Sequence, residues 1–185
     1  MPILGIIASQ NYSRFTPTGS YDALASFTVP SGGVSTITFA GLPTGGQYAH
    51  LQLRLISRNT TSNNQSLKLI FNSDSGSNYS YHRLYGTGSG TGADATANAS
   101  FVLIGVETNT SSTFGTSITD ILDYQSISKF KTTRSLTGWE NNSDGRLFFL
   151  SGNWRNTSAI NSITITPESN SFAQYSQFAL YGVRG

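Results

Sequence analysis

Few residues of this 185-residue chain could perform chemistry, and they are scattered. The chain has two histidines, His50 and His82, and no cysteine, so thiolate metal sites and disulfides are excluded. Neither histidine lies in a metal-binding spacing, and no Gly-x-Ser-x-Gly motif marks a nucleophilic serine. His50 is interpreted as a hydrogen-bonding residue at the start of a strand. The sequence therefore predicts a protein that is not an enzyme and that uses no metal or cofactor.

The carboxylates do not form an obvious catalytic pair. Asp120 and Asp123 are separated by an odd number of residues, so on a regular strand they point to opposite faces. Residues 72–78 (NSDSGSN) alternate oxygen-bearing side chains like the start of a calcium loop. Asp74 is their one carboxylate, however, and the bidentate Glu of the full motif is missing. We interpret this segment as a turn.

Aromatic side chains are the remaining candidates for ligand contact. Tryptophan and tyrosine rings could stack on a sugar if they lie on loops at one end of the fold. The candidates are Trp139, Trp154, Tyr79, Tyr81 and Tyr85. A Trp at the end of a strand also occurs in cores and interfaces, so both interpretations are open.

The spacing of apolar residues predicts the elements that position these side chains. In residues 49–58, Leu51, Leu53 and Leu55 alternate with polar residues, as in a half-buried strand. We expect this segment to be a central strand, with residues 66–72 paired antiparallel to it.

Other segments carry strand and turn signals. Residues 21–29 and 34–39 are expected to form a hairpin or neighbouring strands, and the apolar run 101–106 predicts a strand covered on both faces. Residues 130–139 and 146–154 flank a predicted tight turn. Residues 86–99, which are rich in Gly, Ser, Thr and Ala, predict an exposed, mobile loop.

These signals together predict an all-β fold. No segment has sustained helical periodicity, so we expect little helix and an antiparallel β-sandwich of jelly-roll type. Residues 21–185 are predicted to form a single sandwich domain. Residues 1–20 are predicted to be an extended N-terminal arm, which covers an edge of its own sandwich or reaches a neighbouring subunit.

The arm begins with an apolar tip that contains Ile3, Leu4, Ile6 and Ile7. Because a bilayer needs about 20 apolar residues, this tip is too short to span a membrane. The net charge of +2 comes from scattered basic and acidic residues, so we expect no nucleic-acid partner.

Several strings resemble a family of small virion-associated structural proteins of tailed bacteriophages, over most of the chain. They are MPILGIIASQ, YAHLQLRLISR, NYSYHRLYG, DILDY followed by KFKTTRSLTG, SGNW followed by NTSAINSITITP, and FAQYSQFALYGVRG. The resemblance implies a component of the virion exterior. It favours a homotrimeric capsid decoration (cement) protein that binds the major capsid protein, and the arm is the expected anchor. The alternative is a tail-fibre or receptor-binding adhesin, which would contact tail proteins and, through the five aromatic residues, a host surface glycan.

Overall fold

The computed structural model describes residues 20–61, 63–142 and 144–185. These residues form twelve strands and no helix, and accordingly no helix among them could cross a membrane. The strands are β1 (Tyr21–Thr28), β2 (Ile37–Ala40), β3 (His50–Ser57), β4 (Gln65–Phe71), β5 (Tyr79–Gly86), β6 (Thr91–Ala99), β7 (Val102–Glu107), β8 (Gly115–Leu122), β9 (Lys131–Glu140), β10 (Gly145–Trp154), β11 (Ser162–Pro167) and β12 (Gln177–Val183).

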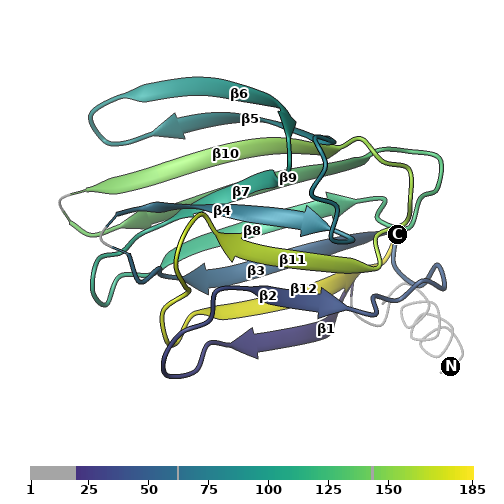
Figure 1. Ribbon diagram of the computed structural model, residues 1–185, viewed down its shortest axis with the longest axis horizontal. Helices are drawn as coiled ribbons and strands as arrows, with labels where there is room; N and C mark the ends of the chain where they lie inside the picture. Colours follow the sequence, from purple (N-terminus) through teal and green to yellow (C-terminus); the bar gives the residue numbers. More distant parts are fainter. Residues whose placement is uncertain (1–19, 62, 143) are drawn as a thin grey trace, which may run out of the picture.

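The strands form two antiparallel sheets that pack face to face. The larger sheet has eight strands in the order β1-β12-β3-β8-β9-β10-β5-β6, and the smaller has four in the order β2-β11-β4-β7. In Figure 1 the smaller sheet lies in front, and β10, β5 and β6 extend beyond it at the top of the view. The predicted all-β sandwich is confirmed.

The connectivity is that of a jelly roll with two inserted hairpins. Without β5–β6 and β9–β10, the remaining strands form two four-stranded sheets, β1-β12-β3-β8 and β2-β11-β4-β7, and the chain changes sheet at every step except from β4 to β7. Two four-stranded sheets wound in this way define a jelly roll. The β9–β10 hairpin pairs with β8 at the edge of the first sheet, and the β5–β6 hairpin pairs with β10 beyond it, so one layer becomes twice as wide as the other.

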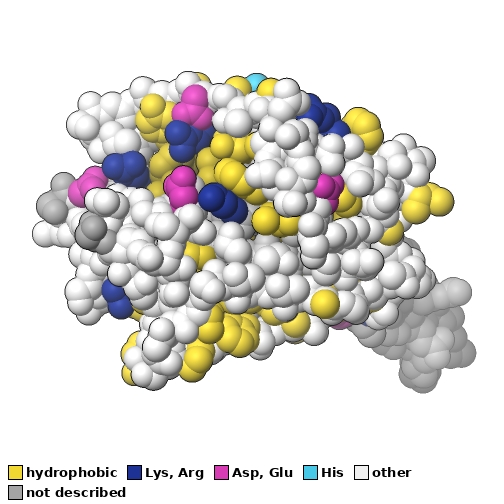
Figure 2. All heavy atoms as spheres, in the orientation of Figure 1, with side chains coloured by type: hydrophobic (Ala, Val, Ile, Leu, Met, Phe, Trp, Pro, Cys, Tyr) yellow, Lys and Arg dark blue, Asp and Glu magenta, His cyan; other side chains and the backbone are white. Residues whose placement is uncertain are grey.

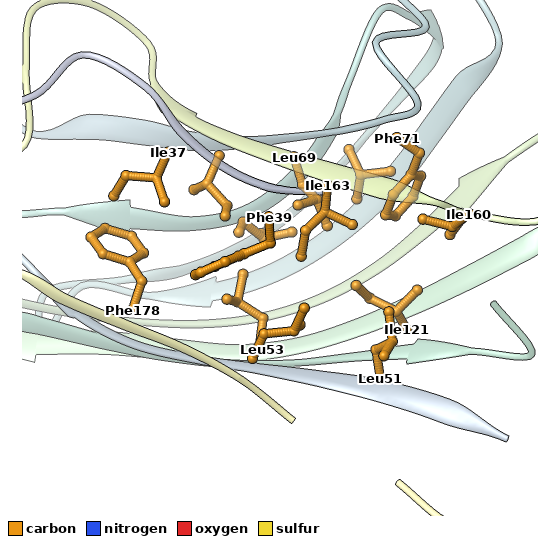
Figure 3. Close-up of a cluster of buried hydrophobic side chains, with 14 of the residues drawn as sticks. Ile37, Phe39, Leu51, Leu53, Leu69, Phe71, Ile121, Ile160, Ile163 and Phe178 are labelled. Carbon is orange, nitrogen blue, oxygen red and sulfur yellow. The ribbon is translucent and has the colours of Figure 1, made fainter. Parts of the chain in front are cut away.

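The apolar core lies between the smaller sheet and strands β1, β12, β3 and β8 of the larger sheet. Leu51, Leu53 and Leu55 of β3 are at most 4% exposed, and β3 pairs with β12 and β8 on its two sides. Figure 3 shows Leu51 and Leu53 pointing toward side chains of the smaller sheet such as Ile163. The predicted central strand is therefore confirmed.

A second part of the interface is built from small side chains. Every residue of β7 is buried, as predicted for residues 101–106. This strand lies against Ser and Thr residues of β8 and β9; Ser117 Oγ, for example, donates to the Ile104 carbonyl at 3.0 Å. Gly152 of β10 has no room for a side chain, because an added Cβ would lie 2.5 Å from Thr133 Oγ1 and closer still to Val102. Small residues therefore allow the two sheets to approach closely here.

Gly152→Ala is expected to destabilise the fold by about 1–3 kcal/mol, the usual cost of overpacking a tight core. The measurement is urea-induced unfolding of the variant and of the unmodified chain. Gly90→Ala is the matched control, because an added Cβ there would meet no atom within 4 Å. Equal midpoints for the two variants would show that the sheets are not closely packed at β7.

Two predicted strand pairings are wrong. Residues 21–29 and 34–39 do not form a hairpin, because β1 pairs with β12 and β2 pairs with β11 in the other sheet. Likewise β4 pairs with β11 and β7 rather than with β3. After β3 the chain crosses between the sheets at buried Asn59, whose Nδ2 donates to the Thr108 carbonyl at 3.2 Å. The chain changes sheet between β1 and β2 and between β3 and β4, so nearness in sequence misleads at these two steps.

The predicted mobile loop at residues 86–99 is also wrong. Most of it forms β6, which pairs antiparallel with β5. The turn before it closes with a hydrogen bond from the Thr87 amide to the Gly90 carbonyl at 2.9 Å. Asp94 of β6 pairs with Arg83 of β5 at 2.7 Å. Backbone pairing with β5 therefore overrides a composition of weak strand formers.

Candidate docking surface

The larger sheet has an outer face that points away from the smaller sheet. The registers align one row of residues across all eight strands: Ser26, Ala179, Arg54, Ile118, Leu136, Phe149, Leu84 and Ala93. Four consecutive members are large and apolar. Ile118, Leu136, Phe149 and Leu84 are 46%, 53%, 47% and 59% exposed. They form a continuous apolar line over β8, β9, β10 and β5.

The next row adds two more large apolar side chains. Ile56 of β3 and Leu147 of β10 are 48% and 59% exposed, and Thr116 and Gly138 lie between them in the register. We call these six residues the outer-face patch; they are Ile56, Leu84, Ile118, Leu136, Leu147 and Phe149. Large contiguous apolar patches on a protein surface usually mark interaction sites. The patch therefore identifies the outer face as a candidate docking surface.

The same face carries two adjoining hollows. The smaller, of about 540 Å³, is lined by residues of β1, β12, β3 and β8. The larger, of about 1280 Å³, is lined by β8, β9, β10 and the turn after β5. Both hollows include Thr116 and Ile118, so they form one continuous groove along the face. We refer to it as the outer-face groove.

A polar row borders the patch. Asp120 accepts hydrogen bonds from Gln52 Nε2 at 2.8 Å and from Arg134 at 3.1 Å. Arg54 donates to Gln52 Oε1 at 2.7 Å and lies over the Tyr181 ring. These groups therefore hydrogen-bond to one another along the border of the patch. An apolar centre with a polar border is the usual arrangement of a protein interface.

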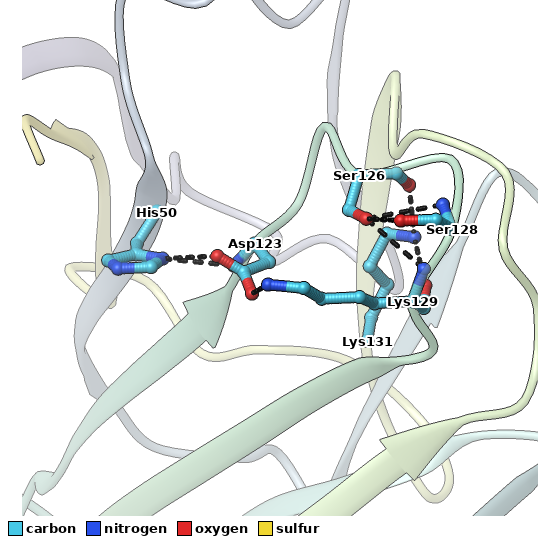
Figure 4. A network of polar contacts seen from close by, with 6 residues as sticks. All are labelled: His50, Asp123, Ser126, Ser128, Lys129 and Lys131. Carbon is cyan, nitrogen blue, oxygen red and sulfur yellow. Dashed lines mark hydrogen bonds and ion pairs between the residues drawn. The ribbon is translucent and has the colours of Figure 1, made fainter.

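Asp123 belongs to a separate network at the end of β8 (Figure 4). Its backbone amide donates to His50 Nδ1 at 2.9 Å, which fits the prediction that His50 is a hydrogen-bonding residue at a strand start. Lys129 donates to its carboxylate at 2.7 Å and thereby holds the pKa of Asp123 below its usual value. Ser126 Oγ accepts from the backbone amides of Ser128 and Lys129. The serines therefore stabilise a turn, and Asp120 and Asp123 have different partners.

Asp74 also has a structural role. Its carboxylate accepts hydrogen bonds from the Gly76 amide at 2.9 Å, Asn78 Nδ2 at 3.0 Å and Trp154 Nε1 at 2.8 Å. Burial raises the pKa of Asp74, but these donors outweigh that effect and lower it overall. Because N–H groups occupy the carboxylate, the segment is a turn rather than a calcium site. Within the described ranges, no group of three or more His, Asp or Glu residues could hold a metal.

The proposed glycan contacts of three aromatic residues do not fit their burial. Trp139, Trp154 and Tyr79 are 6%, 1% and 0% exposed. The Tyr79 and Trp154 rings stack on each other at 6.2 Å inside the core, so neither can stack on a sugar. Tyr81 and Tyr85 are only partly buried, and they lie on strand β5 rather than on an end loop. The packing interpretation therefore holds for the two tryptophans.

The predicted anchor residues of the arm lie outside the described residues. They are Ile3, Leu4, Ile6 and Ile7. The outer-face patch was missed because β9 inverts the expected alternation, with Ser135 and Thr137 buried and Leu136 exposed. Residues 147–150 (LFFL) do carry a sequence signal for the patch, because four consecutive apolar residues in a strand place apolar side chains on both faces of the sheet.

No protein-family model matches this chain, and no curated protein or solved structure matches it either.

Proposed function

We propose that this protein is a non-enzymatic structural component of a tailed-bacteriophage virion, an exterior capsid decoration (cement) protein. The observation that supports this proposal is the outer-face patch, six large apolar side chains on one face of a wide sheet. The string resemblances support the virion setting. In this proposal the protein acts through contacts with other subunits.

The size of the outer face suits such a contact. Eight strands at about 4.8 Å spacing are about 35 Å wide, and the eight residues of a strand such as β3 or β8 extend about 25 Å at ~3.3 Å each. The resulting face of about 900 Å² is close to the ~800 Å² that each partner contributes to a standard interface. The strands between the two edges pair on both sides, so the patch is held on a rigid platform. Many copies, each adding one such contact, would oppose the outward pressure of packaged DNA.

The arm is proposed as a second contact, anchored by Ile3, Leu4, Ile6 and Ile7. Deletion of residues 2–8 is expected to lower the occupancy of the protein on particles and the heat resistance of the particles. Quantitative gel analysis of purified virions, before and after heating, measures both. Unchanged occupancy and heat resistance would show that the arm is not the anchor. The proposed homotrimer is checked by light scattering, and a monomer at micromolar concentration would count against it.

Immunogold labelling of intact particles tests the placement. Gold over the head is expected for a decoration protein. Gold confined to the tail would overturn this assignment and favour the adhesin. An antibody against the described sandwich is suitable, because the β5–β6 hairpin has many exposed residues.

One observation favours the adhesin as a second candidate. Tyr81 stacks with Phe101 at 6.1 Å, and Arg83 lies over the Tyr85 ring while it pairs with Asp94. Figure 2 shows hydrophobic side chains gathered in a hollow beside β5 and β6, with basic and acidic side chains at its border. Aromatic faces next to charged hydrogen-bonding groups are suited to sugars.

A glycan array discriminates between the two candidates. Saturable binding that is lost in Tyr81→Ala and kept in Tyr175→Ala would favour the adhesin. Tyr175 is the matched control because it is 67% exposed and lies outside β5. The decoration protein is expected to give no saturable binding.

A further inference from the structure

We infer that an internal water molecule binds between the two sheets beside Gly115, where it hydrogen-bonds to the Glu107 carboxyl and the Ser57 hydroxyl. The site lies on the inner side of the larger sheet, where the end of β7 meets the end of β3 and the start of β8. This site does not involve the outer-face patch, so it is independent of the proposed function.

The polar groups of the site are buried and lack protein partners. Glu107, the last residue of β7, is 0% exposed, and Ser57, the last residue of β3, is 1% exposed. The Ser57 hydroxyl faces the Glu107 carboxyl, yet among the described residues neither carboxyl oxygen has a full hydrogen bond, and nor does the hydroxyl. Buried polar groups are nearly always paired with protein or with ordered water. These three oxygens therefore require a small partner that both donates and accepts.

Gly115 provides space for that partner. It begins β8, is buried, and pairs with Ser57 in the register of β3 and β8. An added Cβ at Gly115 would lie 3.4 Å from Trp139 Cβ, 3.5 Å from the Gly138 carbonyl oxygen and 3.6 Å from the Val106 carbonyl oxygen, and these are its nearest neighbours. Such distances are ordinary contacts. A methyl-sized group therefore fits beside Gly115, and a water molecule is of similar size.

Two other glycines of the same interface have no such space. An added Cβ at Gly105 would lie 2.8 Å from Thr137 Oγ1, and one at Gly152 would lie 2.5 Å from Thr133 Oγ1. The close approach of the sheets explains why these two positions lack a side chain. Gly115 has neither a close neighbour nor a positive φ that would require glycine. The space beside it is therefore available to a ligand.

The chemistry of the site selects water over a metal ion. Within the described ranges, no group of three or more His, Asp or Glu residues could hold a cation. Internal waters usually form about three hydrogen bonds, which matches the three oxygens of Glu107 and Ser57. Asn59 Nδ2 donates to the carbonyls of Glu107 at 3.4 Å and Thr108 at 3.2 Å, so the chain crossing between the sheets borders the site. A water held there is expected to exchange slowly with the solvent.

Magnetic relaxation dispersion of water tests this inference, because it counts the waters that stay bound for longer than the protein takes to tumble. A chain of 185 residues usually holds about seven internal waters, so the test compares variants. Gly115→Ala is expected to hold one slowly exchanging water fewer than the unmodified chain. Gly90→Ala is the matched control, because an added Cβ there would meet no atom within 4 Å, and its count should not change. Equal counts in all three proteins overturn the inference.

Urea-induced unfolding provides a second readout. Gly115→Ala is expected to lower the unfolding midpoint, because Glu107 and Ser57 lose their partner. In the background Ser57→Ala/Glu107→Leu, which removes these polar groups together, the same substitution is expected to raise the midpoint by filling an apolar space. A less favourable shift in the native background than in the apolar one supports the inference. An equal or more favourable shift in the native background overturns it.

Discussion

Glu107→Gln is expected to stabilise the fold by several kcal/mol at about pH 9 and to leave stability nearly unchanged at about pH 4. Glu107 ends β7 and is 0% exposed. Burial raises the pKa of its carboxyl to about 8. The Ser57 hydroxyl faces the carboxyl and opposes part of this rise, but neither carboxyl oxygen has a full hydrogen bond. The folded state therefore holds a neutral acid in its interior.

The direction of the pH effect follows from the two pKa values. The folded pKa of about 8 lies above the ordinary value of 4.5, so between these pH values the unfolded chain has lost the proton and the folded chain keeps it. Stability contributed by this group is complete below about pH 4.5, falls by about 1.4 kcal/mol per pH unit, and levels off above about pH 8. The folding free energy lost between these two pH values is roughly 3–6 kcal/mol in total. Glutamine has a similar shape and does not titrate, so it removes this dependence.

Urea-induced unfolding at a series of pH values measures this effect. Glu168→Gln is the control, because Glu168 is exposed and should change the stability curve little. If Glu107→Gln has the same pH dependence as the unmodified chain, the carboxyl is not held neutral in the fold.

Lys131→Met is expected to cost about 3 kcal/mol of folding free energy. The Lys131 side chain is 0% exposed, and its ammonium donates to the carbonyls of Ser126 at 2.7 Å, Lys129 at 2.9 Å and Thr157 at 3.2 Å. It thereby ties the loop after β8 to the loop after β10. Methionine has a similar length but no donor, so three carbonyls would lose their partner at once.

Lys129→Met is the matched control for this prediction. The Lys129 side chain is 65% exposed, and its pairing with Asp123 is a surface ion pair, which is worth at most about 1 kcal/mol. Urea-induced unfolding and amide hydrogen exchange in residues 124–130 measure both variants. Equal losses in the two variants would mean that Lys131 does not hold the loops together.

Local alternation was enough to predict the body of the fold. Leu51, Leu53 and Leu55 identified β3 because their faces are unambiguous, and the apolar run 101–106 identified a strand covered on both sides. Strand pairing was not predictable in the same way. The chain changes sheet between β1 and β2 and between β3 and β4, and the partner of β1 is β12, at the other end of the chain.

Two common rules fail in this fold, and the first of them fails at the candidate site, which made that site harder to predict. The first rule places the apolar side chains of a strand on the face that packs against the other sheet. In β9, however, Leu136 is exposed and its neighbours Ser135 and Thr137 are buried. Close approach of β7 requires the small side chains on the inner face, as Gly152 also indicates. The second rule leaves charged residues in solvent, so no pattern marked Glu107 or Lys131 as buried. Both exceptions depend on contacts between strands that are distant in sequence.

In the proposed function, the outer-face patch is the surface that binds the particle. Its most direct test is the binding of the double variant Leu136→Thr/Phe149→Thr to particles assembled without this protein. Thr keeps the strand preference of both positions, and each substitution is expected to cost only about 1 kcal/mol of folding free energy, because only half of each side chain is buried. The control, Ile127→Thr/Phe130→Thr, removes two exposed apolar side chains outside the sheets. We predict that the patch variant loses most of its occupancy while the control binds like the unmodified protein; equal binding of the two variants would contradict the account.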